Sequence, residues 1–455
     1  MFPYLIGLGG VLGYAVLQYG GVLRQEWNYC LAGLGVLALL YFLIAPRAAL
    51  APAPERRLLL PAALLLGLAA LQLVPLPLPA LELLAPARAG QVRALSLAGL
   101  DAGAAGLSVI PGATFGHLLR LAGCAVMFLL AREIVWRRPG RTWAAAAPII
   151  LIAALEAAYG LLLFFDGEPP QPSAHGTYVN RNHFAGLLEM SLPFALMFAV
   201  AGARGSSEGS RRPMRAALRA CGGFAVAALI LVAIIQSYSR MGFVACLLSL
   251  FVMALLALGG RMKAGIKWAA GFALALLAVL AFIYLPPDPL IERFASLTQG
   301  GELTEEGRIY VWGEALPLIK SYALAGCGLG GFESVFFGHQ KMVPVAGVDF
   351  AHNDYLQGLV ELGIAGFAIA AALLLGLLGC AIRGVRQAAG PESHALAVAC
   401  TGSLAAILIH SIVDFNLYIP ANALLLAWVG GIASALEFHR PAPVEQPAWI
   451  DLCRA

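Results

Sequence analysis

Apolar runs long enough to cross a lipid bilayer recur along this chain and constrain its fold more than any other feature. A helix of about 20 apolar residues spans the hydrocarbon core. The 455 residues are 60% hydrophobic and 12% charged, and a soluble domain of this length does not need so much apolar surface. We therefore expect an all-α polytopic membrane protein that forms a single integral membrane domain over residues 1–455.

Twelve apolar runs predict about twelve transmembrane helices, several of them slightly short for a span. Their approximate limits are Pro3–Tyr19, Asn28–Ile44, Leu58–Leu73, His117–Leu130, Trp143–Phe165, His183–Ala201, Ala220–Gln236, Gly242–Leu258, Trp268–Tyr284, Tyr355–Ile382, Leu396–Ile412 and Ala421–Leu436.

The distribution of basic residues predicts the orientation of these helices. One set of loops carries 19 of the 29 Lys and Arg residues, namely 46–57, 132–142, 203–219, 259–267 and 383–393 with the tail 438–455. Because basic loops stay cytoplasmic, we expect both termini and this tail in the cytoplasm, and the opposite side is the periplasm if the membrane is a bacterial inner membrane. The large loop 286–354 then faces the periplasm, where it would form a few short helices. Its segment Arg308–Lys320 has helical spacing.

Polar residues gather at one predicted membrane boundary, in DFAHNDYLQGLVELGIAGF from Asp349 to Phe367. A histidine, an amide and carboxylates stand directly before an apolar helix, where ionisable groups are costly unless they are used. The simpler interpretation is a helix cap made by Asn353 or Asp354. A cap needs one such residue, so we predict that this cluster is the active centre.

The same stretch resembles a known family. His352–Asn353, followed after nine residues by Gly363 and after two more by Gly366, resembles the pattern of the O-antigen ligase and O-antigen polymerase superfamily. Three further segments are similar to it, GTYVNRNHFAGLLEMSLP from Gly176, SYSRMGF from Ser237 and GRIYVWGEALPLIKSYALAGCGLGGF from Gly307. The resemblance implies a GT-C type membrane glycosyltransferase whose donor is a glycan on undecaprenyl pyrophosphate.

Three arginines, Arg181, Arg240 and Arg308, occur in these segments near predicted periplasmic helix ends. A single arginine at such a place is often a snorkelling side chain. Three of them favour an anionic ligand, because guanidinium groups bind phosphate oxygens in bidentate fashion. The resemblance implies pyrophosphate binding for Arg240 and Arg308, and less directly for Arg181.

His352 is the candidate catalytic base, because a neutral imidazole accepts a proton near neutral pH. Asp349 or Asp354 would orient the ring or stabilise its cation, and Asn353 would hydrogen-bond the sugar. The alternative is an interfacial histidine bonded to backbone.

A second polar group, His410 and Asp414, lies at the predicted periplasmic end of the eleventh helix. A spacing of four places the two on one helix face, and we expect them to support His352 through hydrogen bonds; helix termination by Asp414 is the alternative. We expect no metal or other cofactor, because no established metal-ligand pattern accompanies these histidines.

The function predicted is therefore transfer of a glycan, with inversion and without metal, to an acceptor hydroxyl. The acceptor is a second glycan, lipid A core or protein, which leaves O-antigen ligase, polysaccharide polymerase and protein O-oligosaccharyltransferase open. A polysaccharide or lipid transporter is the competing class. A transporter places its polar site near the membrane midplane on broken helices, whereas the polar clusters here lie at predicted helix ends. Nucleic acid is not expected as a partner.

Overall fold

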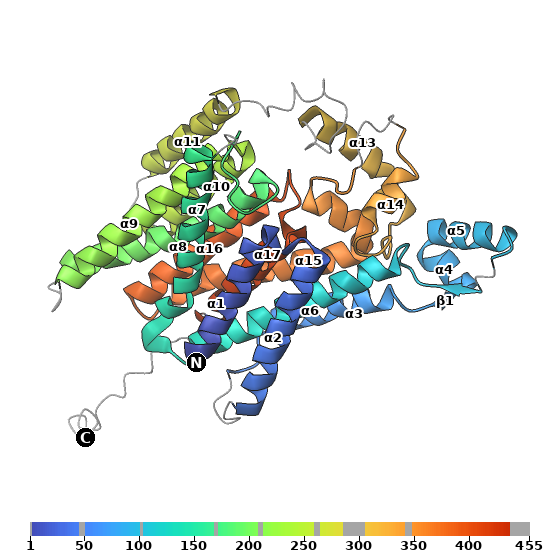
Figure 1. Ribbon diagram of the computed structural model, residues 1–455, viewed down its shortest axis with the longest axis horizontal. Helices are drawn as coiled ribbons and strands as arrows, with labels where there is room; N and C mark the ends of the chain where they lie inside the picture. Colours follow the sequence, from blue (N-terminus) through green and yellow to red (C-terminus); the bar gives the residue numbers. More distant parts are fainter. Residues whose placement is uncertain are drawn as a thin grey trace, which may run out of the picture.

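The computed structural model describes residues 2–44, 51–100, 103–167, 172–207, 213–258, 264–284, 305–341 and 348–436. These residues fold almost entirely into helices (Figure 1). The exception to the all-α prediction within the described ranges is an antiparallel ribbon of two-residue strands, β1 (Leu76–Pro77) and β2 (Ala104–Ala105).

Each of the twelve predicted transmembrane segments coincides with a helix. These helices are α1 (Phe2–Leu17), α2 (Arg24–Ile44), α3 (Arg56–Leu71), α6 (Pro111–Trp136), α7 (Ala147–Asp166), α8 (Arg181–Ser207), α9 (Pro213–Gln236), α10 (Arg240–Leu258), α11 (Ala264–Tyr284), α15 (Asp354–Gln387), α16 (Pro391–His410) and α17 (Pro420–Leu436). Seven helices in the described residues are long and apolar enough to cross a membrane: α2, α7 with the turn before it, α8, α9, α10, α15 and α16. The chain is a polytopic membrane protein.

Helices α8 and α16 lie at the centre of the bundle. In their most apolar windows, 83% and 72% of the residues are buried within the protein, against 17% for α2. Helix α17 is also enclosed, and it packs closely on α6, since a methyl group on Gly431 would lie 2.5 Å from the Phe128 carbonyl oxygen. Close backbone contact of this kind holds helices together where lipid removes the hydrophobic driving force.

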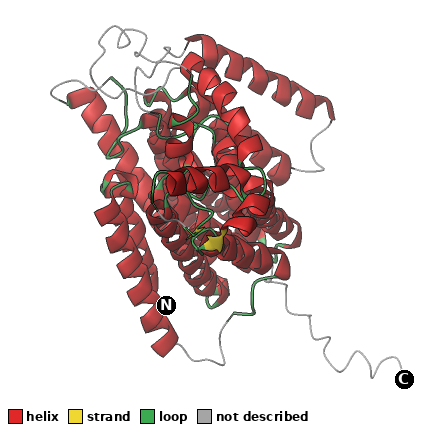
Figure 2. Cartoon of the chain, turned by 90° about the vertical axis from the view of Figure 1, so that its right-hand side faces the viewer, coloured by secondary structure: helices red, strands yellow, loops and turns green. Residues whose placement is uncertain are grey.

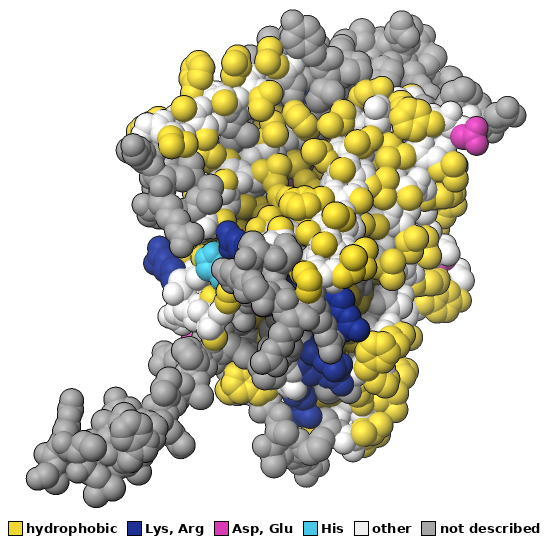
Figure 3. All heavy atoms as spheres, turned by 90° about the vertical axis from the view of Figure 1, so that its left-hand side faces the viewer, with side chains coloured by type: hydrophobic (Ala, Val, Ile, Leu, Met, Phe, Trp, Pro, Cys, Tyr) yellow, Lys and Arg dark blue, Asp and Glu magenta, His cyan; other side chains and the backbone are white. Residues whose placement is uncertain are grey.

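The outer surface of the bundle suits lipid. Figure 3 shows a broad apolar area over the face that carries α9 and α11, with basic side chains gathered below it. Near the beginning of α9 the Arg219 guanidinium makes two bonds of 2.7 Å to the Glu392 carboxylate, which joins α9 to the beginning of α16.

Short helices cover the opposite end of the bundle (Figures 1 and 2). They are α4 (Leu78–Leu84), α5 (Pro86–Leu97), α13 (Glu305–Ser321) and α14 (Phe332–Phe337). Helix α13 confirms the helix predicted at Arg308–Lys320. Two predicted periplasmic loops meet here, because the Val109 amide donates to the Cys327 carbonyl at 2.9 Å. Residues 285–304 and 342–347 of the large loop lie outside the described residues.

Helix α15 is broken at Gly363, whose φ of 68° and ψ of 178° interrupt the helical backbone. The loop after α13 uses the groups that the break leaves without helical partners. The Ile364 amide donates to the Ala323 carbonyl at 2.8 Å, and the Glu361 carbonyl accepts from the Gly328 amide at 3.1 Å. The first part of α15, which carries the polar cluster, is thereby fixed to this loop.

We expect Gly363→Ala to destabilise the protein. A side chain there would hold a left-handed backbone, at a cost of about 1–3 kcal/mol, and its Cβ would lie 2.5 Å from the Leu324 carbonyl oxygen. Thermal unfolding in detergent measures the effect. The control is Gly35→Ala in α2, where nothing lies within 4 Å of an added Cβ. An unchanged unfolding temperature for Gly363→Ala would show that the break tolerates side chains.

Candidate active site

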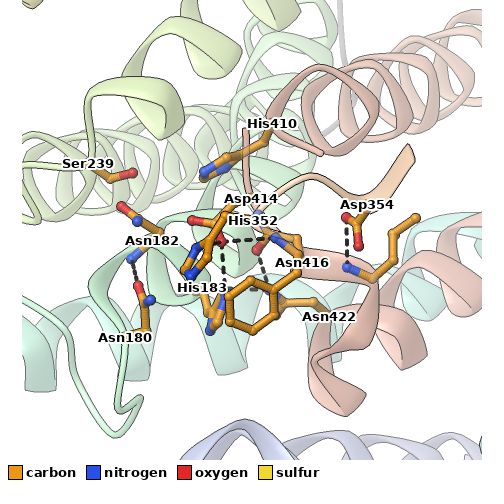
Figure 4. Close-up of polar contacts among 12 residues, drawn as sticks. Asn180, Asn182, His183, Ser239, His352, Asp354, His410, Asp414, Asn416 and Asn422 are labelled. Atoms are coloured by element: carbon orange, nitrogen blue, oxygen red, sulfur yellow. Dashed lines mark hydrogen bonds and ion pairs between the residues drawn. The ribbon is translucent and has the colours of Figure 1, made fainter. Parts of the chain in front are cut away.

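Three basic side chains surround the buried carboxylate of Asp414. Its Oδ1 lies 3.5 Å from His183 Nε2 and 3.5 Å from His352 Nδ1, and its Oδ2 lies 3.8 Å from an Arg308 terminal nitrogen. Figure 4 shows both imidazole rings directed at this carboxylate. The structure therefore brings His352 and Arg308 together, and Asp414 is the group that they share.

Four parts of the chain supply these groups. His183 lies in the first turn of α8, Arg308 in the first turn of α13, and His352 two residues before α15. Asp414 lies between the end of α16 and the short 3-10 helix η5 (Asn416–Tyr418). The site is therefore built at helix ends, as the sequence predicted.

Asp354 joins α15 to the Asp414 segment. Its backbone amide donates to the Ser411 carbonyl at 3.0 Å and to the Asp414 carbonyl at 3.1 Å. Its carboxylate accepts the Leu417 amide at 3.1 Å. Asp354 is buried, with 6% of its surface exposed. Because these contacts are with backbone groups, Asp354 holds the backbone of the Asp414 segment and does not orient the His352 ring. Asp349, the other carboxylate proposed for that role, is exposed.

Phe415 forms an apolar wall for both imidazoles. Its ring packs edge-to-face on His183 at 4.5 Å and on His352 at 4.8 Å, and it stacks on Phe350 at 4.1 Å between centroids. Apolar walls strengthen electrostatic interactions between the polar groups that they enclose.

His352 adopts a backbone conformation that non-glycine residues rarely take, with φ of 48°. Tyr238, which lies two residues before Arg240, does the same with φ of 54°. Such conformations cost on the order of 1–3 kcal/mol and cluster at functional sites. Two of them occur in the segments that carry candidate site residues.

The Asp414 carboxylate is held in its charged form. Burial alone would raise its pKa, but contacts with His183 and His352 and the positive charge of Arg308 outweigh burial and hold the pKa well below its usual range. Asp414 is thus an anion at any physiological pH.

Several buried polar atoms here have no hydrogen-bond partner among the described residues. They are Arg308 Nε, His352 Nδ1, His410 Nε2 and Asp414 Oδ2, together with His183 Nε2. The 3.5 Å separations around Asp414 are longer than good hydrogen bonds. Buried polar groups are normally satisfied, so this concentration of incompletely satisfied atoms is typical of a place built for a polar ligand.

Arg181 and Arg240 begin two helices that pack together at this site. A Cβ on Gly242 of α10 would lie 2.7 Å from the Ala185 Cβ of α8. In Figure 4, Ser239, which precedes Arg240, lies on the same side as Asn182, which precedes His183. The structure therefore places the starts of α8 and α10 beside the Asp414 cluster.

Asn353 caps α15, in agreement with the simpler interpretation of this residue. Its side-chain oxygen accepts the Tyr355 and Leu356 amides at 3.0 and 2.9 Å. Because the side-chain oxygen already accepts two amides of α15, only the side-chain nitrogen of Asn353 is left to bind a sugar. That binding stays a prediction.

The expectation that His410 and Asp414 share a helix face is wrong. Helix α16 ends at His410, and the chain turns before it reaches Asp414. His410 Nδ1 instead contacts the buried Glu189 carboxylate of α8 at 3.0 Å. Asp414 does contact His352, as the predicted supporting network required.

His183 is the group that sequence reasoning missed, since in the sequence it is an ordinary helix-start residue. The Asn422 side chain holds its backbone, donating to the His183 carbonyl and to Asn416 Oδ1, both at 3.0 Å. The signal available was its position in the family-like segment from Gly176. Within the described residues, no group of three or more His, Cys, Asp or Glu side chains could hold a metal ion.

Comparison with known families agrees with the resemblance seen in the sequence. Residues 225–371 match the family model described as O-antigen ligase. This part of the chain, which includes Arg240, Arg308 and His352, is an O-antigen ligase family domain. His183 and Asp414 lie outside the matched range, so the structure is what links them to it. No curated protein matches the chain.

We expect Asp414→Asn to destabilise the protein by about 3–5 kcal/mol, because it leaves buried basic groups without their counter-charge. Because the pKa of Asp414 is lowered in the fold, its contribution is complete above the ordinary Asp pKa of about 3.9 and is lost as the pH falls through the lowered value. The gap in unfolding temperature between the wild type and Asp414→Asn should be wide at pH 7, should begin to narrow below the ordinary Asp pKa of about 3.9, and should close only near the lowered pKa.

The matched control is Asp166→Asn, which neutralises an exposed carboxylate at the end of α7. It should unfold like the wild type at every pH. A gap for Asp414→Asn that stayed constant down to about pH 3, below the ordinary Asp pKa, would contradict the assignment of a buried anion.

Proposed function

From the O-antigen ligase family domain in residues 225–371, we propose that this protein is a periplasm-facing glycosyltransferase of the GT-C type. It moves a glycan from undecaprenyl pyrophosphate to an acceptor hydroxyl, as an O-antigen ligase or polysaccharide polymerase. The observation that carries the proposal is the shared carboxylate of Asp414, which sets a candidate base, His352, beside a candidate phosphate-binding group, Arg308.

His352 is the general base of this reaction. Its Nδ1 faces Asp414, so a proton on Nδ1 is favoured and Nε2 keeps the lone pair. Nε2 takes the proton from the acceptor hydroxyl as that oxygen bonds to the anomeric carbon. The imidazolium formed in this step is stabilised by the adjacent Asp414 anion.

The arginines bind the leaving group. As the bond from the anomeric carbon to the pyrophosphate oxygen breaks, negative charge grows on the pyrophosphate, and Arg308 and Arg240 stabilise it. Arg181 adds to the same positive field. The first turns of α8 and α10 pack together beside the same cluster, and the helix dipole favours anions at such ends.

Direct displacement by the acceptor inverts the anomeric configuration. The pyrophosphate of the donor is already an activated leaving group. The protein therefore needs to supply only the base, His352, and the positive charges of the arginines. Asn353 contributes its amide nitrogen to sugar binding, while Asp354 and His410 hold the segment around Asp414 in place.

The location of the cluster favours an enzyme over a transporter. Its members lie at the ends of α8, α13, α15 and α16 rather than in the middle of spans. Helix α15 is broken, as transporter helices often are, but the loop after α13 fills that break with backbone hydrogen bonds.

The acceptor defines the alternatives within the enzyme class. A second lipid-linked glycan makes the protein a polymerase, lipid A core makes it a ligase, and a Ser or Thr hydroxyl makes it a protein O-oligosaccharyltransferase. The glycan that accumulates in a deletion strain separates them. Single capped units indicate a lost polymerase, unattached long chains a lost ligase, and unglycosylated protein the third activity.

We expect His352→Ala to lower glycan transfer by roughly 10²–10⁴-fold, the usual contribution of general base catalysis. The assay is product formation in membranes of the deletion strain that express each variant. His339→Ala, which removes an exposed histidine after α14, is the control and should retain full transfer. Transfer by His352→Ala at the wild-type rate would remove this residue from the mechanism.

We expect Arg308→Ala to weaken binding of undecaprenyl pyrophosphate by about 10- to 100-fold, the equivalent of one charge-assisted hydrogen bond. Binding is measured on purified protein in lipid nanodiscs. Arg93→Ala in α5 removes an arginine whose side chain is 56% exposed and should leave binding unchanged. Equal affinities for the wild type and Arg308→Ala would exclude Arg308 from the pyrophosphate site.

A further inference from the structure

The residue before the candidate base is held by two side chains from different helices. Trp312 Nε1 of α13 donates to the Ala351 carbonyl at 2.8 Å. The Ala351 amide donates to Gln357 Oε1 of α15 at 2.9 Å. Both backbone polar groups of Ala351 are thus satisfied by side chains, and the residue is fully buried.

The side chain of Gln357 is itself held in place by a hydrogen bond to Glu361. Its amide nitrogen donates to Glu361 Oε1 at 3.2 Å. The Glu361 carboxylate also accepts the Tyr418 hydroxyl at 2.7 Å and the Gly330 amide at 2.9 Å. Gln357 is 1% exposed and Glu361 is 0% exposed, so this chain of hydrogen bonds runs through the protein interior and ends at the backbone of Ala351.

The two bonds to Ala351 matter because the next residue is the candidate base. His352 has φ of 48°, and such a backbone persists only where the surroundings impose it. If Ala351 were free to rotate, His352 could relax to an ordinary conformation. Its imidazole would then leave Asp414 and Phe415, which lie 3.5 and 4.8 Å away.

Helix α13 also connects the two hydrogen bonds on Ala351 with Arg308, the candidate phosphate-binding residue. Trp312 lies one turn after Arg308, so the two share a helix face. That face places a guanidinium near Asp414 and an indole N–H on Ala351. One short helix thus contacts both the residue before the candidate base and the carboxylate that the base faces.

We propose that Trp312 and Gln357 are positioning residues that hold His352 in its strained, reactive orientation through the backbone of Ala351. This inference rests on the proposed function of His352. Neither side chain is assigned a contact with the donor or the acceptor. Their removal should therefore slow the chemical step while leaving binding of the lipid pyrophosphate intact.

The test uses Trp312→Phe, which removes the indole N–H and keeps an aromatic ring, and Gln357→Met, which removes the amide and keeps the length. We expect kcat for glycan transfer to fall about tenfold in each. The donor KM and the affinity for undecaprenyl pyrophosphate should stay within about twofold of wild type. The double variant should lose much less than the product of the two single effects, because either loss alone frees Ala351.

Trp143→Phe is the matched control. It makes the same change at a partly buried indole whose N–H has no partner among the described residues, and it should keep the wild-type kcat. Unfolding temperatures of all variants separate positioning from general destabilisation. If Trp312→Phe and Gln357→Met fail to fold, Trp312→His, which keeps a ring N–H donor, should restore folding and part of kcat.

His352→Ala, assayed alongside, keeps the two hypotheses apart. If it is inactive and Trp312→Phe and Gln357→Met transfer at the wild-type kcat, the positioning role is wrong and the base assignment stands. A fall confined to the donor KM would also overturn positioning, since it would place these side chains in donor binding. Full transfer by His352→Ala would instead contradict the proposed function itself.

Discussion

One buried carboxylate, that of Asp414, makes the polar centre of this protein possible. Imidazoles and a guanidinium at the end of an apolar bundle would be costly to bury without an anion near them. Asp414 supplies that anion to His183, His352 and Arg308 at separations of 3.5–3.8 Å. The contacts are close enough to keep it charged and long enough to leave hydrogen-bonding capacity in the cluster. We infer that a substrate uses this capacity.

The helices around Asp414 are arranged so that its neighbours cannot move away. Helix α15 is broken at Gly363, and the loop after α13 bonds to the backbone on both sides of the break. That connection fixes the first part of α15, which in turn bonds to the Ser411 and Asp414 carbonyls. The strain at His352 is therefore offset by interactions that lie outside the site itself, as is usual for functional strain.

Much of the fold could be predicted from the sequence, because apolar length is a local property that each segment carries by itself. All twelve predicted spans are helices, and the helix at Arg308–Lys320 is also present. The error at His410 and Asp414 came from applying the spacing rule beyond the end of a helix. A terminus at His410 depends on how the following turn packs, which the local sequence does not encode.

The site could be predicted in its members but not in its geometry. His352 and Arg308 were recognised by chemical type and by family-like motifs, and Asp414 by its chemical type and its place near a predicted helix end. Their convergence on one carboxylate depends on tertiary contacts between distant segments, and so does the part played by His183, which reads locally as an ordinary helix start. The two side-chain hydrogen bonds that hold Ala351 are likewise visible only once helices α13 and α15 are placed together, whereas the cap made by Asn353 is local to α15 and could be predicted from the sequence.

The most direct test of the proposed active site is an experimental structure of the protein in a lipid nanodisc with bound undecaprenyl pyrophosphate. We expect the pyrophosphate between Arg308 and Arg240, next to His352 Nε2, with Asp414 on the other side of the imidazole. Density for the pyrophosphate at any place remote from Arg308 and His352 would contradict the proposed active site.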